Sequence, residues 1–214
     1  MTISLRKLSV AVGAAALLSA ATASGALAAN PIVVSYSGGT LTITDPTGVG
    51  QATTIKTSGS GFEVQELNSA NELQAGPGIT AAVQYDSQHW IVVPTSGTVT
   101  QVSIGGANGN DLLSAAGVTN APVAIFGEAG TDYLISGPTA DTIVGGTGND
   151  QIFGGAGNDY LAGGEGSDNI RGENGDDTIY DKDGYADTVN GGNDYDVFTR
   201  DAGLDTASNI ELYQ

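Results

Sequence analysis

Apolar residues recur every nine positions through the C-terminal half of the chain, and polar residues stand on both sides of each one. The series is Leu134, Ile143, Ile152, Leu161, Ile170 and Ile179, and it continues after one inserted residue with Val189 and Phe198. One apolar residue between two polar ones suits a strand of three residues whose central side chain points inward. A fixed short period predicts a solenoid, in which stacked units bury a continuous core.

Aspartate follows the same period, two positions before each apolar residue. The series is Asp132, Asp141, Asp150, Asp159, Asp168, Asp177, Asp187, Asp196 and Asp205, and Asp111 precedes Leu113 in the same way. The best-preserved stretch, residues 145–170, reads GGTGNDQIFGGAGNDYLAGGEGSDNI and repeats the unit Gly-Gly-x-Gly-x-Asp-x-U-x, where U is apolar. Glycine adopts positive φ angles without a steric penalty, so these glycines predict tight turns.

Two such units make a coil of eighteen residues, with one short strand on each of two opposite walls. The predicted fold is therefore all-β, a right-handed parallel β-roll of two short-stranded parallel sheets with an N-terminal β cap. A collagen helix would need glycine at every third position. A disordered tract would not keep an apolar residue in phase with the glycines.

The coil length also predicts where the aspartates lie, because residues eighteen apart are stacked one above the other. One edge should carry Asp132, Asp150 and Asp168. The other edge should carry Asp141, Asp159 and Asp177. Adjacent strands are about 4.8 Å apart and calcium binds oxygens at about 2.4 Å, so two stacked carboxylates could hold one ion together with turn carbonyls. Zinc prefers nitrogen or sulfur ligands, and the chain has one histidine and no cysteine.

Residues 127 to 205 resemble the hemolysin-type, or RTX, calcium-binding nonapeptide repeats, which form a parallel β-roll. The resemblance implies several Ca²⁺ ions, each held between successive coils by the aspartates at position six and by carbonyls of the glycine turns. The side-chain ligands implied in this chain are Asp132, Asp141, Asp150, Asp159, Asp168, Asp177, Asp187 and Asp196. The carbonyl ligands implied are those of Gly146, Gly148, Gly155, Gly157, Gly164 and Gly166.

Some units depart from the repeat. The unit SGPTADTIV (136–144) has Pro138 and Thr139 where turn glycine is expected, and GENGDDTIY (172–180) has Glu173 as its second residue. The unit DKDGYADTVN (181–190) contains an extra residue, and RDAGLDTAS (200–208) keeps only Gly203. We expect weak ion binding beside these units and three to five well-formed sites in total.

The chain begins with a basic and then apolar segment that is typical of a secretory signal peptide. Arg6 and Lys7 precede an apolar stretch from Leu8 to Leu18, and small residues follow up to Ala28. The apolar part is too short to span a bilayer. We predict a signal peptide over residues 1–28, cleavage after Ala28 or Ala29, and a secreted, extracellular protein without a transmembrane anchor.

The rest of the chain is predicted to form two parts, an N-terminal β cap over residues 29–104 and the calcium-binding β-roll over residues 105–214. The segment IVVSYSGGTLTIT (32–44) predicts two strands joined by a tight turn at Gly38 and Gly39. The segment SANELQAGPG (69–78) predicts a loop. The cap would cover the N-terminal edge of the roll, as solenoids require.

Three aromatic residues of the predicted cap, Phe62, Tyr85 and Trp90, are expected to fill its core rather than to bind a ligand. Large aromatic side chains dominate the packing of cores. We therefore assign no binding role to them.

The charge of the chain limits the classes of partner that it is expected to bind. The chain has 24 acidic and 6 basic residues, a formal net charge of -18, and 18 of the acids follow residue 126. Such a surface argues against nucleic acid and anionic membranes and favours cations. Because cysteine is absent, disulfides and thiolate metal sites are excluded.

Catalytic motifs are missing from the sequence. It contains no His-Glu-x-x-His, no Gly-x-Ser-x-Gly and no phosphate-binding loop. The one histidine, His89, has Asp86 nearby but no evident nucleophile. We predict a non-catalytic, secreted calcium-binding protein that folds with calcium and acts in adhesion or in a matrix, through an unidentified partner. The alternative is a small secreted hydrolase whose N-terminal β region is stabilised by the roll.

Overall fold

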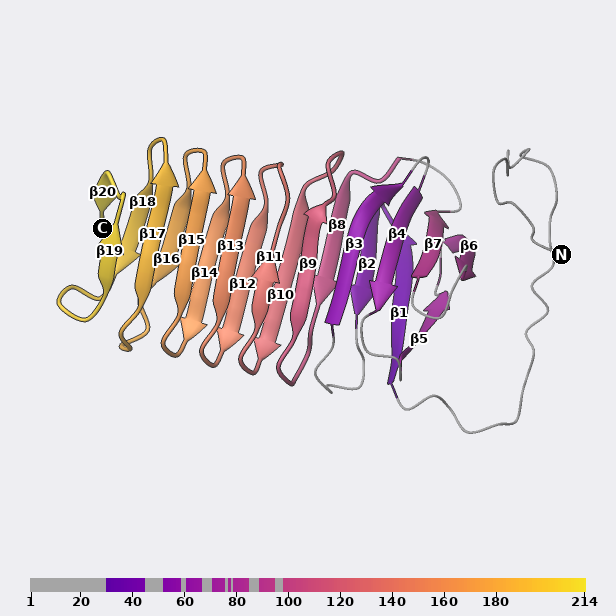
Figure 1. Ribbon diagram of the computed structural model, residues 1–214, viewed down its shortest axis with the longest axis horizontal. Coiled ribbons are helices and arrows are strands. Elements are labelled where there is room, and N and C mark those ends of the chain that lie inside the picture. The colour runs from indigo at the N-terminus through magenta and orange to yellow at the C-terminus, as the bar shows by residue number, and fades with distance from the viewer. Residues whose placement is uncertain are drawn as a thin grey trace, which may run out of the picture.

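Two ten-stranded sheets face each other along an elongated β-solenoid (Figure 1). The computed structural model describes residues 30–44, 52–58, 61–66, 71–75, 77, 79–84, 89–94 and 98–214. The predicted signal peptide and its cleavage site lie outside the described residues.

The chain alternates between the two sheets, so consecutive strands lie on opposite walls. The first sheet contains, in spatial order, β20 (Leu212–Tyr213), β18 (Val197–Arg200), β16 (Thr178–Asp181), β14 (Tyr160–Glu165), β12 (Thr142–Thr147), β10 (Val123–Ala129), β8 (Gln101–Gly105), β2 (Thr40–Thr44), β1 (Asn30–Ser37) and β5 (Asn71–Ala75). The second sheet contains β19 (Thr206–Ser208), β17 (Thr188–Asn193), β15 (Asn169–Asn174), β13 (Gln151–Ala156), β11 (Tyr133–Ile135), β9 (Leu112–Gly117), β3 (Ala52–Ser58), β4 (Gly61–Glu66), β7 (His89–Pro94) and β6 (Ile79–Gln84).

The register of the parallel strands confirms the eighteen-residue coil. Ile143 pairs with Leu161 in the first sheet, and Ile152 pairs with Ile170 in the second. The inserted residue lengthens the next coil by one, because Ile170 pairs with Val189. All strands from β8 to β20 run parallel to their neighbours within each sheet.

The periodic apolar residues form the core between the two sheets, as the sequence predicts. Each is at most 1% exposed: Leu134, Ile143, Ile152, Leu161, Ile170, Ile179, Val189 and Phe198. Every coil contributes one such side chain from each wall. Burying one stabilises the fold by about 1.5–3 kcal/mol, which is a modest gain for a coil of eighteen ordered residues.

The N-terminal strands extend the same two sheets and add antiparallel pairs. Strands β1 and β2 form the predicted hairpin, with Gly38 and Gly39 at φ angles of 58° and 91°. Strand β3 pairs antiparallel with β4, and β7 lies antiparallel between β4 and β6. Strands β2 and β3 pair in parallel with β8 and β9 of the roll, so both sheets continue across residue 104.

The prediction of a loop over residues 69–78 is wrong, because β5 occupies Asn71–Ala75. This strand pairs in parallel with β1, with Asn30 opposite Asn71. A neighbouring strand supplies the hydrogen bonds that the local sequence does not indicate, which is a common reason for such errors. Within the described part of the chain, no helix is long and apolar enough to cross a membrane.

The prediction that three aromatic residues fill the core of the cap is confirmed for one of them. Phe62 is 2% exposed and belongs to the hydrophobic core, as expected. Trp90 lies in β7, where side-chain surroundings are not described, and Tyr85 lies outside the described residues.

Candidate metal centre

The turns that connect the two sheets form two rims, one along each edge of the solenoid. The first rim holds the turns that lead from the first sheet to the second, and its aspartates are Asp111, Asp132, Asp150, Asp168, Asp187 and Asp205. The second rim holds the returning turns, and its aspartates are Asp141, Asp159, Asp177 and Asp196. All ten are buried, with at most 7% of each residue exposed.

Hydrogen bonds join the aspartates of each rim into a ladder. On the first rim, the backbone N–H of Asp132 donates to Oδ1 of Asp150 at 2.8 Å, and that of Asp150 donates to Oδ1 of Asp168 at 2.7 Å. On the second rim, the N–H of Asp159 donates to Oδ1 of Asp177 at 2.9 Å. The predicted alignment of aspartates along two edges is therefore confirmed.

The second carboxylate oxygen has a different environment. In eight buried aspartates the Oδ2 atom has no hydrogen-bond partner within the described residues: Asp132, Asp150, Asp159, Asp168, Asp177, Asp181, Asp187 and Asp196. Leaving a buried polar atom unsatisfied costs free energy, and an ionised carboxylate costs more unless a positive charge compensates it. These oxygens need a proton or a cation.

The unpaired oxygens face backbone carbonyls beside the first glycine of each unit. A Cβ atom added to Gly154 would lie 2.6 Å from Oδ2 of Asp159 and 2.8 Å from the carbonyl oxygen of Gly172 on the next coil. Only glycine, which has no side chain, leaves the space between these two oxygens open. We call this space a cradle. Equivalent cradles lie beside Gly127, Gly145, Gly172 and Gly191. Their ligands are all oxygen, which suits a hard cation such as calcium.

The six predicted carbonyl residues lie in the same turns, at positions two and four of their units. All six have positive φ angles, between 103° and 135°. Their carbonyls point along the stack, since that of Gly146 approaches Gly164 and that of Gly148 approaches Gly166. The carbonyls at position one, such as that of Gly172, are the ones that meet Oδ2. These carbonyls were not among the predicted ligands, although the first glycine of each unit marks them.

Asp141 differs from the other predicted ligands because its own turn satisfies it. Its Oδ2 accepts a hydrogen bond from the N–H of Gly137 at 3.1 Å. Its Oδ1 accepts from the Thr139 hydroxyl at 2.6 Å and from the N–H of Val123 at 2.8 Å. Ser136 stands at position one and donates its hydroxyl to the carbonyl of Gly154. In this turn, which departs from the repeat in sequence, protein groups satisfy both carboxylate oxygens. We call such a turn closed and a turn with an unpaired Oδ2 open.

Asp181 is a buried carboxylate that the sequence analysis missed. Its oxygens lie close to those of Asp168 and Asp187, and the three side chains offer ligand atoms within 4.8 Å of one another. Asp181 stands at position one, where most units have glycine. An acid at that position is the signal that could have identified it.

Burial raises the pKa of several rim aspartates. The pKa of Asp150, Asp168 and Asp177 rises to about 6, mainly through desolvation, although the ladder hydrogen bonds lower it. Desolvation likewise raises the pKa of Asp159 to about 8, and the charges of Asp177 and Asp141 add to the shift. A cation at the rim would favour the ionised carboxylates instead.

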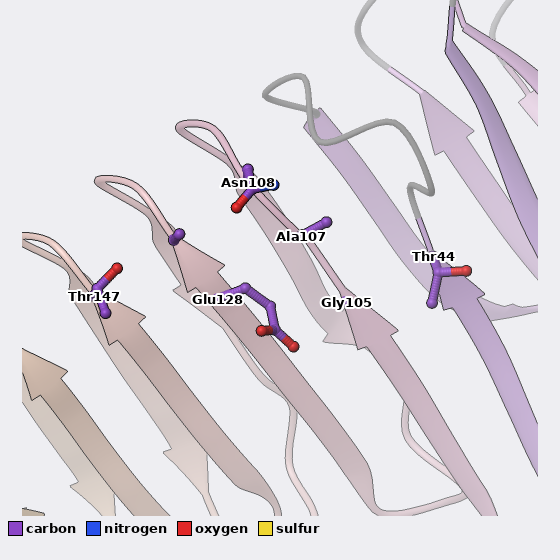
Figure 2. A pocket seen from close by; sticks show the side chains of 7 residues that line it. Thr44, Gly105, Ala107, Asn108, Glu128 and Thr147 are labelled. Carbon is purple, nitrogen blue, oxygen red and sulfur yellow. The ribbon is translucent and has the colours of Figure 1, made fainter.

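A groove on the first sheet is the other candidate site, and Figure 2 shows its lining residues Thr44, Gly105, Ala107, Asn108, Glu128 and Thr147. Its volume is about 520 Å³, and Glu128 is the one acid among the described residues that line it. Glycoside hydrolysis commonly uses two carboxylates, and the described lining residues of this groove supply one. His89 of the hydrolase alternative lies in β7, and Asp86 lies outside the described residues.

Comparison with known proteins agrees with the geometry of the rims. The family of RTX calcium-binding nonapeptide repeats matches this chain in four copies, at residues 124–143, 135–170, 153–184 and 163–198. No curated protein and no solved structure matches the chain. The matched copies cover all eight aspartates with an unpaired Oδ2 atom.

Proposed function

We propose, on the premise that residues 124–198 consist of RTX calcium-binding repeats, that this protein is secreted and folds its roll around calcium outside the cell. We further propose that it has no catalytic activity and serves in adhesion or in a matrix. The observation that carries the calcium part is the set of buried, unpaired Oδ2 atoms opposite carbonyl oxygens.

Electrostatics supports the coupling of folding to calcium. Two carboxylates about 4.8 Å apart repel each other by roughly 3–4 kcal/mol at an effective dielectric constant of about 20. Burial of one side chain from each wall of a coil is already opposed by the conformational entropy of eighteen ordered residues, so it leaves little to offset that repulsion. One ion at ten times its dissociation constant adds about 1.4 kcal/mol, and several ions reverse the balance.

The cradles give an expected stoichiometry. Five cradles, beside Gly127, Gly145, Gly154, Gly172 and Gly191, pair an unpaired carboxylate oxygen with a carbonyl of the next coil. A sixth, beside Gly163, faces two carboxylates. We therefore expect six ions at these six cradles. Extracellular modules bind calcium at about 0.1–1 mM, a concentration that calcium reaches outside cells.

The proposed location and role rest on the sequence. The basic and apolar N-terminal segment supports secretion, and the net charge of -18 supports cation-bridged contacts. The lack of catalytic motifs in the sequence and the single acid among the described lining residues of the groove in Figure 2 support a non-catalytic role.

Calorimetric titration of the full chain with Ca²⁺, followed in parallel by circular dichroism, tests the proposal. We expect several ions to bind and the β signal to appear with them, whereas Mg²⁺ at equal concentration should act weakly. Asp159→Asn should remove one ion. The control Asp194→Asn makes the same chemical change at an exposed turn residue and should bind as wild type. A full β signal in chelator at neutral pH would refute the proposal.

A further inference from the structure

One cradle on the first rim is built differently from the others. The units at Gly127, Gly145 and Gly163 begin with glycine, but the next unit on this rim begins with Asp181 and contains the inserted residue. Asp181 is the last residue of β16 and is 1% exposed. A charged residue buried to this extent needs a partner of opposite charge.

The side chain of Asp181 points into the cradle beside Gly163. Its Oδ1 accepts a hydrogen bond from the N–H of Gly164 at 3.3 Å, and its Oδ2 has no hydrogen-bond partner among the described residues. A Cβ atom added to Gly163 would meet Oδ2 of Asp168 and, at 2.5 Å, Oδ2 of Asp181. Other cradles have a neutral carbonyl oxygen in this place, so a carboxylate replaces it here.

Asp187 completes a group of three. It is 2% exposed, its Oδ1 accepts a hydrogen bond from the N–H of Asp168 at 2.9 Å, and its Oδ2 is unpaired. Ligand oxygens of Asp168, Asp181 and Asp187 lie within 4.8 Å of one another. In the described part of the chain no lysine or arginine forms a salt bridge with them. An ion bound at about 2.4 Å from each oxygen fits between them.

We propose that Asp168, Asp181 and Asp187 form a three-carboxylate Ca²⁺ site that binds more tightly than the other cradles and fills first. The inference rests on the proposed function, since it ranks one site among several. Calcium affinity rises with the number of charged ligands, and this cradle has one carboxylate more than a cradle with a carbonyl. The site also spans the inserted residue, where the coil lengthens from eighteen to nineteen residues.

Calorimetric Ca²⁺ titration of the full chain with two substitutions at one position tests the site. Asp181→Asn removes the charge and keeps the shape, and Asp181→Gly restores the residue found in the neighbouring units. Both should weaken the tightest binding step by about tenfold or more, and Asp181→Gly should keep the total number of ions. The control Glu165→Gln removes one acid from an exposed position of the same coil and should leave the tightest step unchanged.

The outcomes separate this inference from the proposed function. If the wild-type chain binds calcium and the tightest step of Asp181→Gly is unchanged or tighter, the three-carboxylate site is overturned. Calcium binding by the roll is then unaffected. A wild-type chain that binds no calcium would overturn both. Circular dichroism at saturating calcium checks the fold, and Asp181→Gly decides the question if Asp181→Asn does not fold.

Discussion

Two successive turns of the second rim, residues 136–141 and 154–159, contain buried aspartates at the same position. The two aspartates differ in their hydrogen bonds. Asp141 and Asp159 both stand at position six and are 3% and 2% exposed. Asp141 accepts hydrogen bonds at both oxygens from its own turn, whereas Oδ2 of Asp159 has no partner in the described structure. The first turn starts with Ser136 and has Thr139 at position four. The second has Gly154 and Gly157 at these positions.

The difference teaches that a periodic aspartate does not by itself identify an ion site. The same solenoid accommodates a buried carboxylate either with hydroxyl and amide donors of its own turn or with an external cation. The residue at position one decides between them, because its side chain either occupies the cradle or leaves it open. Ser136 occupies it and glycine opens it, while Asp181 adds a further charge to the cradle of the preceding coil.

The largest effect on folding is expected when calcium is removed and the pH is varied. Desolvation raises the folded-state pKa of Asp159 to about 8 and that of Asp150 and Asp168 to about 6, whereas the unfolded value is about 3.9. A raised folded pKa contributes stability that is present below the unfolded pKa and is lost as the pH rises through the folded pKa. The calcium-free chain should therefore fold near pH 4–5 and unfold between about pH 6 and pH 8.

Circular dichroism of the metal-free chain from pH 4 to pH 8 measures this effect. The calcium-loaded chain is the control and should stay folded at pH 8, because each ion compensates the ionised carboxylates. A β signal of the metal-free chain that grows with rising pH would show that the open turns do not depend on a proton or a cation.

The repeating part of the fold could be predicted from the sequence because its signals are local and periodic. Ile152 and Ile170 are buried and paired as their spacing predicts, and the ladder of Asp132, Asp150 and Asp168 follows from the same spacing. One apolar position and one aspartate in each unit suffice to set the coil length and both rims. Periodicity carries no information where the repeat is interrupted.

The features that could not be predicted depend on contacts between distant residues. Strand β5 forms because β1 lies beside it, and no pattern within residues 69–78 indicates that partner. The replacement at Ser136 is visible in the sequence, but its hydrogen bond to Gly154 requires the next coil. Asp181 joins Asp168 only because the coils stack in the observed register.

A smaller effect is expected when the open turn is given the first residue of the closed one. Gly154→Ser places a Cβ atom 2.6 Å from Oδ2 of Asp159 and 2.8 Å from the carbonyl of Gly172, so the side chain occupies the cradle. We expect the loss of one calcium ion and a decrease of about 2–4 kcal/mol in the free energy of unfolding at saturating calcium. Calorimetry gives the stoichiometry and urea denaturation gives the stability.

The matched control for this substitution is Gly105→Ser. A Cβ atom at Gly105 would make ordinary contact, 3.7 Å from the Thr44 side chain, and would meet no aspartate oxygen within 4 Å. It should bind the wild-type number of ions. If Gly154→Ser also binds that number, the side chain at position one does not control access of the ion.

The smallest effect on stability is expected from a substitution in the closed turn, residues 136–141. Thr139→Val keeps the shape of the side chain but removes the hydroxyl that donates to Oδ1 of Asp141 at 2.6 Å. We expect a decrease of about 1–2 kcal/mol in the free energy of unfolding, measured by urea denaturation in calcium, with no change in the number of ions. Thr147→Val is the control, since Thr147 is exposed on β12, and it should be nearly neutral. The loss of an ion in Thr139→Val alone would mean that the turn 136–141 also binds calcium, and the contrast between the two turns would then disappear.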